Sequence, residues 1–194
     1  MGSIHDETPI PAPAPESQYG LSSKGDFALS LGLRLAEWRR RGSAPALLMM
    51  RIDDLPSLVT RCGREIADLI VRSAVRFLNA SIRAMDLGSQ EGEADFAMLL
   101  PGTNTMELIR VAEQLRQAVA RWVLPTDGKS VQFTVSLAGA VAIQADTAEE
   151  MLARVEVALG QAAASGGNRT FFHNGRQAKP AQATLDRIRK APVV

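Results

Sequence analysis

Apolar residues recur every three or four positions in four stretches of the chain, which is the spacing of an amphipathic helix. The clearest stretch runs without a break from Ile66 to about Arg83. Thr147 and, three residues later, Glu150 form a capping box, so another helix is predicted to begin there and to end near Gly166. The predicted helices cover residues 26–41, 66–83, 108–119 and 148–166.

Short apolar runs between these helices predict strands. Residues 46–52, 96–100 and 169–173 are such runs, and residues 131–143 alternate apolar with smaller or polar side chains, the period of a strand. Three other segments are predicted to connect these elements. Pro56 and Gly63 bracket a short connecting segment, Gly88 and Gly92 mark a turn region, and residues 126–128 form a turn. The alternation of helices and strands predicts one α/β domain with helices packed on a central sheet.

The two ends of the chain differ from this pattern. Pro9, Pro11, Pro13 and Pro15 alternate with small residues, which favours an extended, semi-rigid linker. A proline-rich ligand for a partner domain is the alternative. The C-terminal segment is polar with one short candidate helix around Leu185, either docked or frayed. We therefore expect a tail or linker at 1–18, a domain at 19–175 and a polar tail at 176–194.

Composition excludes several classes of protein. The chain has 194 residues, 46% of them hydrophobic and 22% charged, with a formal net charge of +1, which is typical of a globular domain. A single cysteine and two distant histidines exclude a disulfide scaffold and a Cys/His zinc site. The balanced charge argues against nucleic-acid binding, and the arginines at 39–41 suit the end of a helix dipole. With no spanning segment and no signal peptide, we expect a cytoplasmic protein without a membrane partner.

Four local strings, taken in order, resemble the GGDEF domain of bacterial diguanylate cyclases. They are FAMLLPGT at 96–103, AEQLRQAV at 112–119, VSLAG at 135–139 and GNR at 167–169. The likeness covers about Gly20 to Phe172. It implies a nucleotidyl cyclase-like fold, related to the polymerase palm, with a mixed, mainly antiparallel sheet of about five strands. Members of this family join two GTP molecules into cyclic di-GMP.

That chemistry needs carboxylates, because Mg²⁺ is held by acidic oxygens and phosphates. The family's signature turn is Gly-Gly-(Asp/Glu)-Glu-Phe, and here residues 92–96 read Gly-Glu-Ala-Asp-Phe. The resemblance puts Glu93 at the second glycine, where a side chain would obstruct the nucleotide, and Ala94 at the metal-binding acid. Asp95 keeps a carboxylate, but its side chain is shorter than the glutamate of the signature. The plainer interpretation of Asp95 is an exposed strand residue.

Other family positions have also changed. The metal-binding aspartate of the first strand corresponds to Arg51, while Asp53 matches the second aspartate of that motif. The guanine-reading asparagine corresponds to Val59, and its partner is kept as Asp68, which also suits a helix N-terminus. The cations that grip the triphosphate correspond to Ala163 and Gly167. The resemblance thus implies a catalytically inactive domain without metal or other cofactor. Mg²⁺ would be needed only if cyclase activity survives, for instance through Glu93 and Asp53.

One family site is kept. The product-inhibition motif Arg-x-x-Asp is present as Arg83 and Asp86, and five residues separate it from Gly92, as in the family. An arginine fork can bond a phosphate or the edge of guanine, and an aspartate can accept from guanine N–H groups. The family recruits a further arginine from the next helix, where this chain has Gln114; Arg110, one turn earlier, is a substitute. The alternative is an inherited local ion pair.

These residues lead to a main hypothesis and two alternatives. The main hypothesis is a cyclic di-GMP-binding regulatory module that acts through Arg83 and Asp86. The alternatives are a ligand-free domain that binds an unknown protein partner, and a weakly active diguanylate cyclase. A homodimer remains open, because active members of the family work as dimers.

Overall fold

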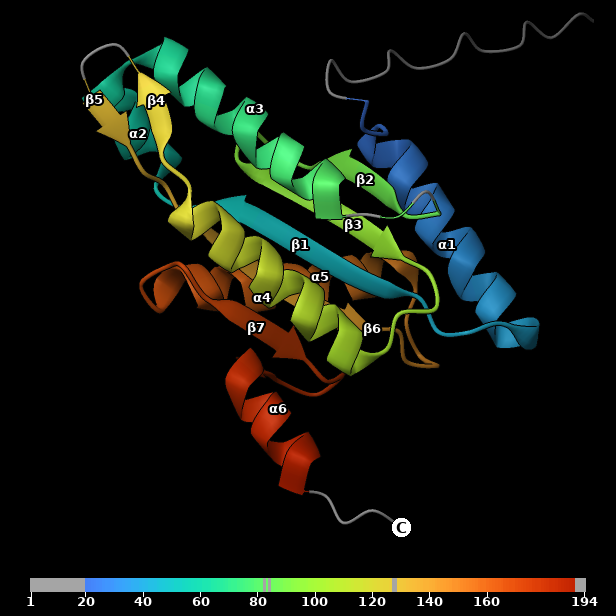
Figure 1. Cartoon of the computed structure of the whole chain (residues 1–194). Coiled ribbons are helices and arrows are strands. Elements are labelled where there is room, and N and C mark those ends of the chain that lie inside the picture. The colour runs from blue at the N-terminus through green and yellow to red at the C-terminus, as the bar shows by residue number, and fades with distance from the viewer. Residues whose placement is uncertain (1–19, 82, 84, 127–128, 191–194) are drawn as a thin grey trace, which may run out of the picture.

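The computed structural model describes residues 20–81, 83, 85–126 and 129–190. Its centre is a six-stranded sheet in the order β2-β3-β1-β6-β7-β8 (Figure 1). Only the β6–β7 pair is parallel, so the sheet is mixed and mainly antiparallel, which confirms the expected fold class with one strand more than expected. The strands are β1 Ala46–Ile52, β2 Leu87–Gln90, β3 Asp95–Leu100, β6 Val135–Val141, β7 Thr170–His173 and β8 Ala178–Pro180.

Helices cover both faces of this sheet. On one face lie α3 and α4, and on the other lie α5 and α1, which packs against α5 and β2 (Figure 1). The helices are α1 Lys24–Arg41, α2 Leu55–Cys62, α3 Arg64–Ser81, α4 Thr105–Arg121, α5 Ala148–Ala164 and α6 Ala181–Lys190. The capping box of Thr147 with Glu150 is confirmed, because each side chain accepts a hydrogen bond from the other residue's backbone N–H.

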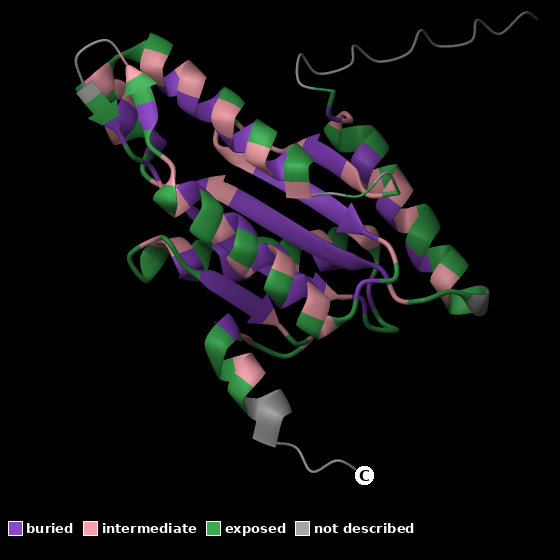
Figure 2. Cartoon of the chain, in the orientation of Figure 1, coloured by how far each residue is buried: buried purple, intermediate pink, exposed green. Residues whose placement is uncertain are grey.

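The core has two halves, one on each side of the sheet. The central strand β1 supplies both, since successive side chains of a strand point to opposite faces. Leu48 and Met50 pack with α3 and α4, whereas Leu47 and Met49 pack with α1 and α5. Figure 2 shows β1 buried along most of its length. The carboxyl end of β1 is therefore held rigidly, and it is there that Arg51 and Asp53 lie.

Three segments differ from the predictions. Residues 55–62 form α2 instead of a plain connection, because Pro56 lies in the first turn, where no N–H is needed, and Gly63 ends the helix with φ 89°. Gly88 lies inside β2 instead of a turn: a Cβ there would come within 2.8 Å of Leu21, so glycine permits close packing. The alternating run 131–143 is divided between β6 and a small second sheet, β4 Leu124–Thr126 with β5 Lys129–Val131.

The main sheet continues beyond residue 175. Strand β8 pairs with β7, and α6 follows it directly. Ala181 is buried and Leu185 packs partly against the core. The predicted tail at 1–18 and the turn residues 127–128 lie outside the described residues. No helix in the described ranges is long and apolar enough to cross a membrane.

Candidate functional site

The ends of β1 and β3 hold an ion pair in place of a carboxylate cluster. Strand register sets Arg51 directly opposite Asp95. The guanidinium binds the carboxylate in a fork, with Nε 2.6 Å from Oδ1 and Nη2 3.1 Å from Oδ2. This bonding to Asp95 raises the pKa of Arg51, against the opposing effect of partial burial. Asp95 is therefore a half-buried ion-pair partner of Arg51 and not simply an exposed strand residue.

The turn between β2 and β3 is held by its own backbone. The N–H groups of Glu91 and Gly92 both donate to the carbonyl of Asp95, at 2.8 and 3.1 Å. The carbonyl of Ala94 accepts from the N–H of Ile52 at 2.9 Å, which ties the turn to the end of β1. The turn therefore keeps its shape through contacts that involve no ligand.

Glu93 lies within this turn and not in a strand, so the alternation of side chains along a strand does not determine the direction of its side chain. Its carboxylate meets Arg64 of α3 at 2.6 Å. Arg64 also pairs with Asp68 at 3.2 Å. Both acids are about half exposed, so they share one cation on the outer surface, and Glu93 does not join Asp53.

The Asp53 carboxylate is occupied by groups of the chain itself. Its Oδ2 accepts from the Thr134 hydroxyl at 2.6 Å and from the backbone N–H of Asn168 at 2.8 Å. Its Oδ1 accepts from the Ser136 hydroxyl at 2.7 Å. A Cβ on Gly167, which has φ 68°, would lie 2.9 Å from the Asp53 carboxyl carbon. Asp53 thus fastens the loop after α5 to the end of β1.

Asn168 extends this network to α4. Its side-chain oxygen accepts from Arg116 at 2.7 Å, and Arg116 also forks onto Glu113. Burial raises the pKa of Glu113, but hydrogen bonding to Arg116 outweighs it, so the pKa is lowered overall. Nothing in the sequence pattern indicated this connection, because Arg116 and Asn168 are 52 residues apart.

These residues do not fit a magnesium ion. A guanidinium lies at the end of β1, Ala94 offers no oxygen, and both oxygens of Asp53 already accept hydrogen bonds. In the described ranges, no three His, Cys, Asp or Glu side chains gather closely enough to hold a metal ion. Mg²⁺ prefers several oxygen ligands in near-ideal octahedral geometry. The arrangement here is a closed polar network.

Arg83 and Asp86 form a tight turn at the far end of the sheet. The Asp86 carboxylate accepts from the backbone N–H of Arg83 at 2.6 Å, and the N–H of Asp86 donates to the Arg83 carbonyl at 3.0 Å. Their side chains form no ion pair among the described contacts, so Asp86 closes the turn through the backbone. The Arg83 side chain is exposed.

This turn borders α1. Arg83 lines a hollow of ≈ 410 Å³, and Asp86 lines a second hollow of ≈ 580 Å³. Arg34, Glu37 and Met85 line both, so the two hollows adjoin along α1. Sequence reasoning missed the part that α1 plays here, because only the packing of α1 beside β2 brings it to this turn.

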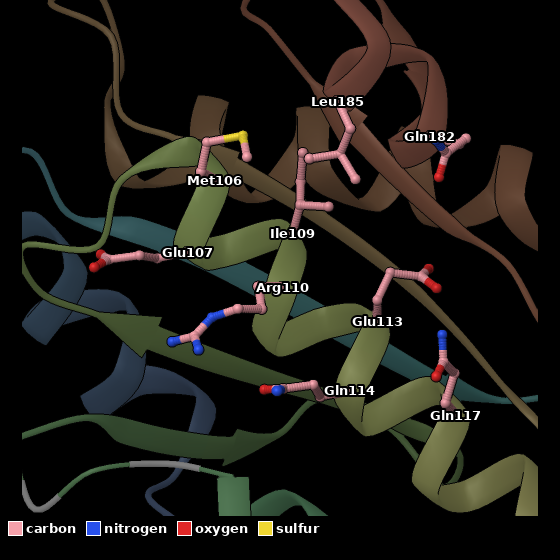
Figure 3. A pocket seen from close by; sticks show the side chains of 9 residues that line it. All are labelled: Met106, Glu107, Ile109, Arg110, Glu113, Gln114, Gln117, Gln182 and Leu185. Atoms are coloured by element: carbon pink, nitrogen blue, oxygen red, sulfur yellow. The ribbon is translucent and has the colours of Figure 1, made fainter. Parts of the chain in front are cut away.

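Arg110 and Gln114 lie on a different surface. They line a groove of ≈ 570 Å³ between α4 and α6, whose apolar side chains include Ile109 and Leu185. Figure 3 shows both side chains pointing away from Leu185 and Gln182 of α6. Neither residue lines the hollows beside Arg83 and Asp86. The structure therefore does not bring all four residues into one pocket.

The family model described as "Diguanylate cyclase, GGDEF domain" matches residues 20–169, most of the chain. The chain belongs to the GGDEF domain family. The match ends close to the loop that Asp53 fastens, so β8 and α6 lie beyond it.

Two longer proteins are similar to this chain over part of their length. The response regulator PleD of Caulobacter vibrioides is 28% identical over 130 residues, which are 66% of this chain and 29% of PleD. Diguanylate cyclase A of Treponema denticola is 23% identical over 125 residues, 64% of this chain and 34% of that protein. The chain thus spans about a third, or less, of the curated relatives that it matches.

Solved GGDEF structures have the same fold. The GGDEF domain of DgcB from Caulobacter crescentus, crystallised in complex with c-di-GMP, superposes with a TM-score of 0.75 at 20% identity and covers 79% of this chain and 89% of that one. The diguanylate cyclase SiaD from Pseudomonas aeruginosa, in complex with its activator SiaC, gives 0.75 at 22% identity, with 80% and 60% covered.

Proposed function

We propose that this GGDEF domain synthesises no cyclic di-GMP and instead binds it at Arg83 and Asp86. The absence of cyclic di-GMP synthesis is supported by the Arg51–Asp95 ion pair at the end of β1. The family resemblance puts a metal-binding aspartate at the position of Arg51. A fixed guanidinium there repels a divalent cation and occupies the neighbouring carboxylate. A triphosphate cannot then be aligned for attack, because its charge has no metal to neutralise it.

The other substituted positions support the same conclusion. Val59 and Ala163 lack the polar groups that the family uses for guanine and for phosphate. Gly167 could not regain a basic side chain without displacing Asp53, whose carboxyl carbon would lie 2.9 Å from the new Cβ. Restoring one catalytic residue would therefore leave the rest of the chemistry unsupported. The domain needs no metal and no other cofactor for the role proposed here.

The turn of Arg83 and Asp86 suits an anionic guanine nucleotide. The Arg83 guanidinium is exposed, and the other oxygen of Asp86, Oδ1, accepts no hydrogen bond from the described residues. Trp38 lines the hollow beside Arg83 and provides an aromatic surface for stacking a base. The domain of DgcB, a relative in fold, was crystallised with c-di-GMP.

Isothermal titration calorimetry with cyclic di-GMP tests the binding half of the proposal. We expect saturable heat with a micromolar dissociation constant, and a loss of at least about tenfold in Arg83→Ala, because charge-assisted hydrogen bonds to phosphate or guanine disappear. Arg76→Ala is the matched control, since Arg76 is an exposed arginine on α3. Absence of heat, or equal binding in wild type and Arg83→Ala, would contradict the proposal.

Incubation with GTP and Mg²⁺ or Mn²⁺ tests the catalytic half. We expect no cyclic di-GMP even at high protein concentration. Product that scales with protein concentration would overturn the inactive assignment and favour a weakly active cyclase.

A second candidate function is a protein-interaction module. It is favoured by the exposed leucines of α1, Leu29 and Leu33, which are 64% and 62% exposed. SiaD, another relative in fold, was crystallised with an activator protein. A pull-down in which partners depend on the globular domain, together with a silent cyclic di-GMP titration, would support this second candidate.

A further inference from the structure

A small hollow lies where the family match meets the last elements of the chain. It has a volume of ≈ 270 Å³ and is lined by α4, the start of β7, the end of β8 and the first turn of α6. The family model stops at Arg169, so the wall that β8 and α6 supply lies outside the match. The hollows beside Arg83 and Asp86 adjoin β2, and β2 and β8 are opposite edges of the sheet (Figure 1). This hollow is therefore separate from the proposed cyclic di-GMP site.

One buried hydroxyl faces this hollow without a partner. Thr170 lines the hollow and is only 6% exposed. Among the described residues, its hydroxyl oxygen is the one buried side-chain polar atom that forms no hydrogen bond. Burying an unpaired hydroxyl costs free energy, and valine would fill nearly the same space without that cost. The Thr170 hydroxyl therefore indicates a ligand that forms a hydrogen bond there.

The first turn of α6 brings backbone donors to the same hollow. Pro180 lines it together with Ala181 and Gln182, the first two residues of the helix. The first N–H groups of a helix have no partner within the helix, and they carry a partial positive charge. No acidic residue in the first turn of α6 balances this charge. Such an N-terminus favours an anion, and phosphate groups in particular.

The charged side chains around the hollow also favour an anion. Arg169 is exposed, and its Nε donates to the Ser165 carbonyl at 2.8 Å, while no described contact uses its two Nη groups. Glu113 also lines the hollow and would repel an anion on its own. Its carboxylate is forked by Arg116, so that pair is neutral as a whole. The remaining charge is the Arg169 guanidinium and the positive end of α6.

We propose that this hollow binds a phosphate group, either inorganic phosphate or the terminal phosphate of a small ester. The phosphate oxygens accept hydrogen bonds from the Thr170 hydroxyl, from the N–H groups at the start of α6 and from Arg169. A terminal phosphate has three strong acceptor oxygens, so it can meet all three kinds of donor at once. Cyclic di-GMP has phosphodiesters and no terminal phosphate. The two binding proposals are therefore independent, and the failure of one leaves the other standing.

A neighbouring groove gives room for the organic part of an ester. Glu113 and Gln182 line both the hollow and the groove of ≈ 570 Å³ between α4 and α6. Figure 3 shows Glu113 on the α4 side of this groove and Gln182 on the α6 side. Ile109 and Leu185 provide apolar surface further along it. A phosphate held in the hollow can therefore carry a small apolar group in the groove.

A titration of the full chain with inorganic phosphate, followed by the backbone amide signals in ¹H–¹⁵N NMR, tests the site. The pH and the ionic strength are kept constant with sodium chloride. We expect saturable shifts at Thr170, Ala181 and Gln182, with a dissociation constant in the millimolar range or below. Thr170→Val and Arg169→Gln should each weaken binding at least about tenfold, because each removes a hydrogen bond to a charged ligand. The matched control is Arg176→Gln, since Arg176 is exposed and does not line the hollow, and it should bind like wild type.

The Thr170→Val variant also separates a ligand role from a structural role. Because the hydroxyl has no partner in the chain, urea unfolding in phosphate-free buffer should show no loss of stability in this variant. A clear loss there would show that the hydroxyl has a structural partner and would overturn the proposal. No saturable shift in wild type, or equal binding by wild type, Thr170→Val and Arg169→Gln, would overturn it as well.

Two further ligands identify what the hollow accepts. Phenyl phosphate that binds more tightly than inorganic phosphate, with added shifts at Ile109 and Leu185, would assign the site to an ester. Equal affinity without those shifts would assign it to free phosphate. Acetate should bind more weakly than either, because a carboxylate has only two oxygens for the three kinds of donor. Acetate that binds as tightly as phosphate would refute the assignment to a phosphate group.

Discussion

The ion pair between Arg51 and Asp95 gives the sharpest prediction. It links the central strand β1 to the first residue of β3, and it lies where the family resemblance puts a metal-binding site. Arg51→Ala removes the guanidinium and leaves the Asp95 carboxylate half-buried without its partner. If the pair holds the two strand ends together as a metal would, this substitution must destabilise the domain.

The expected size of the effect follows from the exposure of the pair. The side chains of Arg51 and Asp95 are 32% and 26% exposed. Exposed ion pairs contribute about 0–1 kcal/mol, whereas breaking a buried pair costs about 3–5 kcal/mol. The fork geometry favours a value between these ranges. We therefore expect Arg51→Ala to lower the free energy of unfolding by about 2 kcal/mol, which corresponds to about 4–8 °C in Tm for a chain of this size.

A double-mutant cycle measures the pair itself. Urea unfolding of wild type, Arg51→Ala, Asp95→Ala and the double variant should give a coupling energy of about 1.5 kcal/mol. The control cycle uses Arg34 and Glu37, an ion pair of one helix turn that is 47% and 64% exposed and should couple by less than about 0.5 kcal/mol. Equal coupling energies in the two cycles would refute the reasoning, because the Arg51 pair would then be an ordinary surface contact.

Three further predictions concern other parts of the fold. Arg154→Ala should lower the free energy of unfolding by about 3–5 kcal/mol, because it leaves the 3% exposed Asp146 carboxylate without its cation; urea unfolding that shows a loss below about 1 kcal/mol would contradict this. Gly167→Ala should cost about 1 kcal/mol more than Gly20→Ala, since both glycines have φ near 70° but only the first would press on a carboxylate; equal losses would argue against the clash. Burial, with the charge of Arg154, lowers the pKa of His173, so the folded state binds this proton more weakly than the unfolded state. Stability should therefore fall as the pH drops below about 6.5, and a His173→Gln variant with an equally steep fall in Tm would disprove that origin.

The parts of the fold that sequence patterns predicted are those with a strong apolar period. Helices α3 and α5 each bury a continuous side against the sheet, so their spacing alone identified them. In α2 only Leu55 and Leu58 are buried, which is too few to establish a period. Strand β8, Ala-Lys-Pro, has no apolar pattern and is a strand because it pairs with β7. Short elements whose stability comes from neighbours were therefore missed.

The candidate site could likewise be predicted from the sequence only in part. The identity of each charged residue can be read from the sequence, and the family resemblance indicates which ones have changed. Their partners cannot be read, because they come from distant segments: Asp53 accepts from groups 81, 83 and 115 residues away. Asp95 looked like an ordinary strand residue until the register of β1 and β3 set it opposite Arg51.

The surviving acids at the end of β1 are therefore weak indications of a remnant metal site. Carboxylates gathered around a metal repel one another when the metal is absent. Here Asp95 is neutralised by Arg51, Glu93 by Arg64, and Asp53 is held by hydroxyl and amide donors. A metal nucleotide would have to break these contacts before it could bind. The exposed Arg83 guanidinium has no partner among the described residues, so a ligand there gains an ion pair without breaking one. This difference favours ligand binding at the Arg83 turn over catalysis at β1.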